Sequence, residues 1–237
     1  MDDNRLGKHI SQVFNEELED LRSNVMAMGG LVEEQVNHAV GAFLSRDTET
    51  ADNVIRRDHQ VNRLEVQIDE ECTRILAKRQ PAASDLRMII AVIKTITDLE
   101  RIGDEAEKIA HITIHSNDRA SIENSLLATV QQMGELAAHQ LHDALDAFAR
   151  LDTETAVATV KRDTKLDDIY SGLMRQTATF VMEDPRNFSQ IFDVLWSVRA
   201  LERIGDHAKN ICEYVIFLVK GKDIRHTSIE NLENAAR

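Results

Sequence analysis

The sequence LERIGD at residues 99–104 occurs a second time at residues 201–206. When each copy is extended by six residues, eight of the twelve positions are identical. Further upstream, residues 42–51 and 147–156 agree at seven of ten positions. Similarity at a nearly constant offset is typical of a duplicated structural unit. The chain therefore consists of two copies of one unit, and its fold is that of the unit repeated.

The composition indicates a helical unit. Only 4% of the 237 residues are aromatic, and the chain has nine Gly and two Pro. This is typical of a helical protein packed by Leu, Ile, Val and Ala, whereas a sheet protein carries more turn residues. Two units of roughly 110 residues are each long enough to bury a hydrophobic core.

Apolar residues recur at helical spacing in three stretches of each copy. The stretches run from about residue 10 to 44, 54 to 76 and 86 to 114, and then over about 119–150, 153–183 and 186–219. Three long helices joined by short turns pack antiparallel. We therefore predict an all-α protein of two tandem, pseudo-symmetric three-helix bundles. A single extended coiled-coil rod is the alternative, and the five breaks between the stretches argue against it.

Local signals mark the ends of these helices. Asp47 or Thr48 is suited to cap the second helix, and Pro81 to stand in the first turn of the third. The polar segment 116–121 separates the bundles, and Gly221 ends the last helix. The predicted organisation is a first bundle over 1–116, a second bundle over 117–221 and a polar C-terminal tail over 222–237.

Charge and apolar content limit the class of partner. The net charge of −13 repels nucleic acid and anionic lipid. The N-terminus has no basic segment followed by an apolar one, and the strongest apolar run, residues 214–219, is too short to span a bilayer. We expect a cytoplasmic protein that reaches membranes only through its partners. Cys72 and Cys212 are not equivalent in the repeat, so we expect buried thiols rather than a disulfide or metal ligands.

Each repeated motif places two acids on the apolar stripe of a helix. Like charges four residues apart disfavour a helix by about 0.2–0.5 kcal/mol, and burial of an unpaired carboxylate costs several kcal/mol. A cation is therefore expected to balance them. Gly103 and Gly205 cost about 1 kcal/mol relative to Ala in mid-helix, which suits a place without room for a side chain. The stripes consist of Ile89, Ile93, Ile96, Glu100 and Asp104, and of Ile191, Leu195, Val198, Glu202 and Asp206.

The middle helix of each bundle supplies further oxygen ligands. If the chain reverses at Pro81, the first pair of acids lies opposite residues 58–62, and reversal at Pro185 places the second pair opposite residues 163–168. Because the ligands shared by both copies are oxygens, we expect Mg, Mn or Fe, with Zn possible. The predicted metal ligands are Asp58, Asn62, Glu100 and Asp104 in the first bundle, and Asp163, Asp167, Glu202 and Asp206 in the second.

The same acids have a simpler interpretation. Glu100 and Asp104 can belong to a solvated face on which Arg101, Glu105 and Arg203 supply surface ion pairs. The duplication, the apolar flanks and the facing acids favour the metal site.

The two LERIGD motifs and the joints Lys78-Arg-Gln-Pro81 and Met182-Glu-Asp-Pro185 resemble the PhoU family over essentially the whole chain. The resemblance implies that the Glu/Asp-x-x-x-Asp motifs of the two bundles bind metal ions or multinuclear metal clusters. It also implies a cytoplasmic negative regulator of the phosphate-starvation response that modulates phosphate uptake. Such proteins link the phosphate ABC transporter, through its ATPase subunit, to a sensor histidine kinase, and they form homodimers.

The leading hypothesis is thus a metal-binding adaptor with no catalytic residues. A carboxylate-bridged metalloenzyme or metal store is the alternative, but di-iron proteins use Glu-x-x-His on paired helices of a four-helix core, and neither stripe carries that motif. A purely structural coiled-coil dimer leaves the duplicated acids without a cation. The sequence has no Gly-rich phosphate loop or basic pocket, so phosphate status is expected to arrive through a partner.

Overall fold

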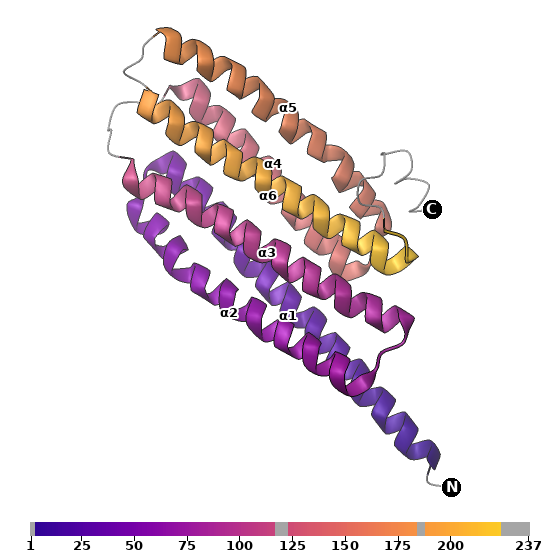
Figure 1. Ribbon diagram of the computed structural model, residues 1–237. Coiled ribbons are helices and arrows are strands. Elements are labelled where there is room, and N and C mark those ends of the chain that lie inside the picture. Colours follow the sequence, from indigo (N-terminus) through magenta and orange to yellow (C-terminus); the bar gives the residue numbers. More distant parts are fainter. Residues whose placement is uncertain (1–2, 117–122, 184–187, 224–237) are drawn as a thin grey trace.

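The computed structural model describes residues 3–116, 123–183 and 188–223. These residues form six α-helices and no strand (Figure 1). The prediction of an all-α fold is therefore confirmed. The helices are α1 (Asp3–Ser45), α2 (Thr48–Arg79), α3 (Ala83–His115), α4 (Asn124–Arg150), α5 (Thr153–Glu183) and α6 (Phe188–Lys220).

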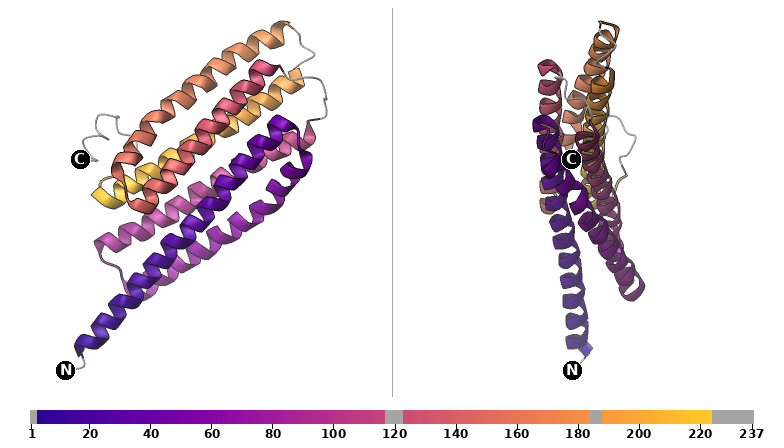
Figure 2. Two further views of the ribbon diagram at one scale, coloured as in Figure 1. Left: turned by 180° about the vertical axis from the view of Figure 1, so that it is seen from behind. Right: turned by 90° about the vertical axis from the view of Figure 1, so that its left-hand side faces the viewer.

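The helices form the two predicted three-helix bundles. Helices α1, α2 and α3 pack against one another, and α4, α5 and α6 do the same. The bundles lie side by side, with α3 against α6 and α1 against α4, and the first turns of α1 extend beyond the other helices (Figures 1 and 2). The buried apolar side chains of both bundles form one contiguous core. Within the described ranges, no helix has an apolar stretch long enough to cross a bilayer.

The starts of α2 and α5 and the end of α6 follow capping signals in the sequence. Asp47 accepts hydrogen bonds from the backbone N–H groups of Glu49 and Thr50 at 3.0 and 3.1 Å, and Asp152 makes the equivalent bonds at the start of α5. The hydrogen bonds from the neighbouring threonine hydroxyl and backbone hold the pKa of both aspartates below its usual range. Gly221 has a φ of 69° and follows the last residue of α6, as predicted.

The predicted position of Pro81 was wrong. Helix α2 ends at Arg79, the capping residue Gln80 that follows it adopts a left-handed backbone with a φ of 46°, and α3 begins only at Ala83. Pro81 therefore lies in the connection rather than in the first turn. The predicted joint at 184–185, most of the junction 116–121 and most of the tail 222–237 lie outside the described residues.

Two equivalent glycines bring the bundles together. A Cβ atom on Gly134 of α4 would lie 2.6 Å from Val40 Cγ1 of α1, and one on Gly29 of α1 would lie 2.5 Å from Leu145 Cδ2 of α4. Gly29 and Gly134 are equivalent in the repeat, and so are Val40 and Leu145. Each bundle thus places a branched side chain against a glycine of the other, so the contact is pseudo-symmetric.

Gly134→Leu is expected to lower the free energy of unfolding by roughly 3 kcal/mol, because a new side chain at this contact must displace the stiff β-branched Val40. The control is Gly41→Leu, since Gly41 is an exposed helical glycine at which a Cβ atom would meet no neighbouring element within 4 Å. Chemical denaturation followed by circular dichroism compares the two. Equal stability of the two variants would contradict this account of the bundle contact.

Candidate metal centre

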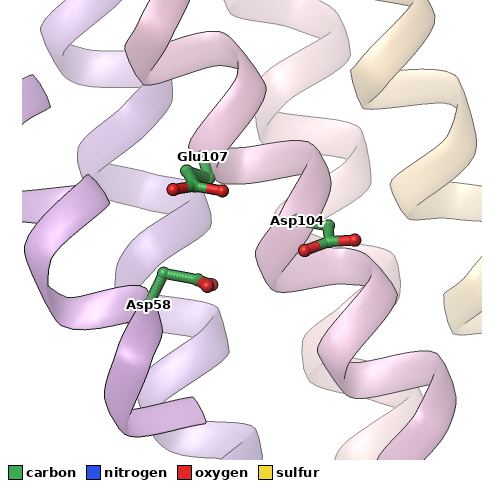
Figure 3. A group of neighbouring side chains, drawn as sticks. All are labelled: Asp58, Asp104 and Glu107. Carbon is green, nitrogen blue, oxygen red and sulfur yellow. The ribbon is translucent and has the colours of Figure 1, made fainter. Parts of the chain in front are cut away.

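Three acids of the first bundle converge between α2 and α3. Asp58 projects from α2 toward α3, where Asp104 and Glu107 lie one turn apart (Figure 3). One carboxylate oxygen from each lies within 4.8 Å of the others. Asp58 is only 3% exposed, whereas Asp104 and Glu107 are half-buried. Three oxygens this close repel one another unless a cation or protons neutralise them.

Buried polar atoms beside these acids have no partner within the described residues. Asp58 Oδ2 accepts a hydrogen bond from Asn62 Nδ2 at 2.9 Å, while Asp58 Oδ1 and Asn62 Oδ1 have none. Gln35 of α1 is 3% exposed, and both atoms of its amide group are unpaired. Buried polar groups are nearly always hydrogen-bonded. The orphaned oxygens therefore indicate that the centre accommodates a further positively charged or hydrogen-bonding species.

The glycine of each motif leaves space for these side chains. A Cβ atom on Gly103 would lie 3.1 Å from Asp58 Oδ1 and 3.3 Å from Gln35 Oε1. A Cβ atom on Gly205 would lie 2.6 Å from Leu166 Cδ2. The interpretation that bulk is excluded beside the acids thus has a direct geometric basis. In the first bundle the excluded volume is occupied by the polar atoms themselves.

The electrostatics of the centre favour protons or a cation. Burial, followed by the charges of Glu107 and Asp104, raises the pKa of Asp58. Burial and the charge of Asp104 likewise raise the pKa of Glu100. Burial also raises the pKa of Glu65. A group of acids with raised pKa values in one place is a recognised sign of a functional site.

Glu100 and Asp104 also contact the arginine of their own motif. Arg101 lies 3.5 Å from Glu100 and 3.6 Å from Asp104, but its side chain is 54% exposed. Ion pairs of such length at the surface contribute little. Glu105, by contrast, is buried, and it binds Lys108 at 2.9 Å and Arg203 of α6 at 3.1 Å. Glu105 and Arg203 thus join the two bundles rather than forming a solvated surface pair.

The equivalent centre of the second bundle is built differently. Asp163 is 2% exposed, and both its oxygens are bonded. Gln140 Nε2 donates to Asp163 Oδ1 at 3.0 Å, and Lys209 Nζ donates to Asp163 Oδ2 at 2.9 Å. Burial works against the charge of Lys209, but the hydrogen bond and charge of Asp163 outweigh it and raise the pKa of the lysine.

The other predicted acids of the second bundle lie around this pair. Asp167 and Asp206 are exposed, and Glu202 accepts two hydrogen bonds from Arg199 at 2.8 and 2.7 Å. Burial, followed by the charge of Asp206, raises the pKa of Glu202. Burial, followed by the charge of Asp163, raises that of Asp167. Among the described residues, only the first bundle brings three acids within the close spacing given above.

Two residues of the centre were missed by the sequence interpretation. Glu107 has Lys209 as its repeat equivalent, so an interpretation based on features common to both copies overlooks it. Gln35 was missed although its equivalent, Gln140, is also glutamine. The recurrence of this glutamine was a usable signal. Cys72 and Cys212 are both buried, as predicted.

The fold and the site define a class of helical protein in which two repeated three-helix bundles each carry an acidic cluster beside a helical glycine. A family model described as the PhoU domain matches residues 25–113 and again 130–215. The chain belongs to the PhoU family.

Relatives and solved structures agree with this assignment. The chain is 49% identical over 227 residues to a Pseudomonas putida protein named as a phosphate-specific transport system accessory protein PhoU homolog, with 96% of this chain and 88% of that protein covered. The crystal structure of PhoU from Pseudomonas aeruginosa superposes with a TM-score of 0.84 at 48% identity, covering 88% of this chain and 100% of that one. The phosphate transport system regulatory protein PhoU from Streptococcus pneumoniae superposes with a TM-score of 0.82 at 31% identity, covering 89% and 98%.

Proposed function

We propose that this protein is a cytoplasmic accessory protein of phosphate transport that represses the phosphate-starvation response and modulates phosphate uptake. Its proposed partners are the ATPase subunit of the phosphate ABC transporter and a sensor histidine kinase, and it is expected to act as a homodimer. Support comes from the names of relatives that match nearly the whole chain. The protein acts by contact with these partners rather than by catalytic turnover.

Metal binding is the second part of the proposal, and the unpaired oxygen of buried Asp58 is the observation that carries it. Asp58, Asp104 and Glu107 are the proposed direct ligands, with Asn62 and Glu100 beside them. Carboxylate and amide oxygens suit Mg²⁺, Mn²⁺ or iron. An ion held between α2 and α3 neutralises the acids and fixes the spacing of the two helices.

An exposed row of aromatic side chains supports the docking role. Phe188, Phe192 and Trp196 follow one another along α6, with ring centroids 4.8 and 6.4 Å apart, and each is at least 41% exposed. Contiguous apolar patches on a surface commonly mark interaction sites. We call this surface the aromatic row.

The aromatic row borders a groove of about 390 Å³ between α3 and α6. Its basic side chains come from two helices that are distant in the sequence, so the expectation of no basic pocket was wrong for this surface. Lys108, Arg199 and Arg203 line it together with a single acid, Glu105, although the whole chain carries a net charge of −13. Charge complementarity therefore favours an acidic, amphipathic segment of a partner protein as the occupant.

Replacing both Phe192 and Trp196 with glutamine is expected to weaken binding to the purified ATPase subunit or to the purified cytoplasmic part of the kinase by about tenfold or more, because exposed aromatic anchors dominate interfaces. Val66→Gln is the control, since Val66 is 55% exposed on α2 and lies outside the aromatic row. Each partner is immobilised on a surface and titrated with the wild-type or variant chain to measure the affinities. Unchanged affinity for both partners, or loss of dimers with partner binding intact, would overturn this assignment of the surface.

The alternative function is a carboxylate-bridged metalloenzyme or metal store. The cluster of oxygen ligands is the feature that favours it. Catalytic oxidation of ferrous iron by the purified protein, together with no binding to either proposed partner, would select this alternative over the adaptor.

A further inference from the structure

We propose that Lys209 is a built-in counter-cation of the second bundle, so that the two acidic centres are not equivalent and only the first takes a metal ion. The proposal rests on the metal-binding role proposed above and assigns that role to one bundle. The ligand class is a divalent cation that prefers oxygen.

The two positions that decide the difference are equivalent in the repeat. Glu107 lies three residues after Asp104, and Lys209 lies three residues after Asp206. Both project from the helix that carries the motif toward the buried aspartate of the middle helix, Asp58 or Asp163. The first copy of the repeat therefore has an acidic residue at this position, and the second copy has a basic residue.

In the second bundle, both carboxylate oxygens of the buried Asp163 accept a hydrogen bond. Lys209 Nζ lies 2.9 Å from one oxygen of Asp163, and Gln140 Nε2 lies 3.0 Å from the other. Gln140 Nε2 also donates to the backbone oxygen of Gly205 at 3.2 Å. A metal ion bound to Asp163 must displace the ammonium group and lies close to a like charge. Both effects oppose metal binding at this centre.

In the first bundle, the equivalent aspartate and glutamine are not paired in this way. Asp58 Oδ1 has no hydrogen-bond partner among the described residues, and neither does the amide group of Gln35, which is the equivalent of Gln140. Both side chains are almost fully buried, and both approach the Cβ position of Gly103. Glu107 adds a third negative charge where the second bundle has its ammonium group. A cation from solution therefore completes the first centre, whereas the second is complete without one.

An exchange of the two side chains tests the proposal. Calorimetric titration with Mn²⁺ is expected to show binding in the wild-type chain that Asp58→Asn removes and Asp163→Asn leaves in place. Glu107→Lys should also remove it. Lys209→Glu should add a second set of sites of comparable affinity. Binding in the wild-type chain that is lost on Asp163→Asn, or no gain of sites in Lys209→Glu, would overturn the proposal.

A second measurement needs no metal. In excess chelator, Lys209→Gln is expected to lower the melting temperature by roughly 5–10 °C, because it leaves Asp163 buried without its cation. Glu107→Gln removes a repulsive charge and is expected not to lower it. Equal effects of the two variants would overturn the proposal. If no chain binds Mn²⁺ while the melting temperatures differ as expected, the metal role fails and the counter-cation role of Lys209 is upheld.

Discussion

A chain carrying Asp58→Asn is expected to bind Mn²⁺ at least about 100-fold more weakly than the wild-type chain, since the substitution removes the one ligand that lies on α2 and is fully buried. The same substitution is expected to raise the melting temperature of the metal-free protein at pH 8, because it removes a buried charge that lacks a cation. A purely structural aspartate would show neither the loss of affinity nor the gain in stability.

The pH dependence of that gain follows from the raised pKa of Asp58. The folded chain holds this proton more tightly than the unfolded chain does, so the contribution of Asp58 to stability falls as pH rises from about 4 through the raised pKa. The stability difference between Asp58→Asn and wild type should therefore vanish below about pH 4 and be largest at neutral and alkaline pH.

Asp69→Asn serves as the matched control, because Asp69 is an exposed acid on the same helix. It should change neither the affinity for Mn²⁺ nor the melting temperature appreciably. Differential scanning fluorimetry in chelator and calorimetric titration give the two quantities. Unchanged Mn²⁺ affinity in Asp58→Asn would mean that Asp58 is a structural residue and not a metal ligand.

Deletion of the gene from its host is expected to leave the phosphate-starvation genes switched on in phosphate-rich medium. The reason is that the proposed adaptor links the transporter to the kinase when phosphate is plentiful. Without the adaptor, the kinase is not switched off. A reporter fused to a starvation promoter measures the effect. The wild-type chain supplied on a plasmid should restore repression, and the chain with glutamine at Phe192 and Trp196 should not.

Normal regulation in the deletion strain would contradict the adaptor role. Restoration of repression by the double aromatic variant, at the same cellular level as the wild-type chain, would contradict the role of the aromatic row alone. The experiment therefore separates the function from the surface assigned to it.

The fold was largely predictable because its determinants are local. Helical spacing, the cap at Asp47 and the stop at Gly221 each depend on a few neighbouring residues, and the repeat supplied the helical pattern and the aspartate cap twice. The position of Pro81 was predicted wrongly, since the left-handed Gln80 lengthens the turn before α3. The docking of the bundles was not predicted. It depends on Gly29 and Gly134 meeting side chains far away in the sequence.

The site was predicted in part. The facing of Asp58 and Asp104 followed from counting turns along antiparallel helices, and the structure brings the two together. Glu107 and Lys209 were not predicted as site residues, because a search for features common to both copies discards the positions at which the copies differ. Which polar atoms are left without partners depends on side-chain packing in three dimensions. No sequence pattern reveals this for Gln35 or for Asp58 Oδ1.

Elemental analysis of protein purified without added metal or chelator tests the central claim most directly. The wild-type chain and the Asp163→Asn chain are expected to retain a divalent metal or iron at a similar ratio to protein, and the Asp58→Asn chain is expected to retain almost none. Equal metal content in all three chains, or none in the wild-type chain after growth in metal-replete medium, would contradict a metal centre in the first bundle.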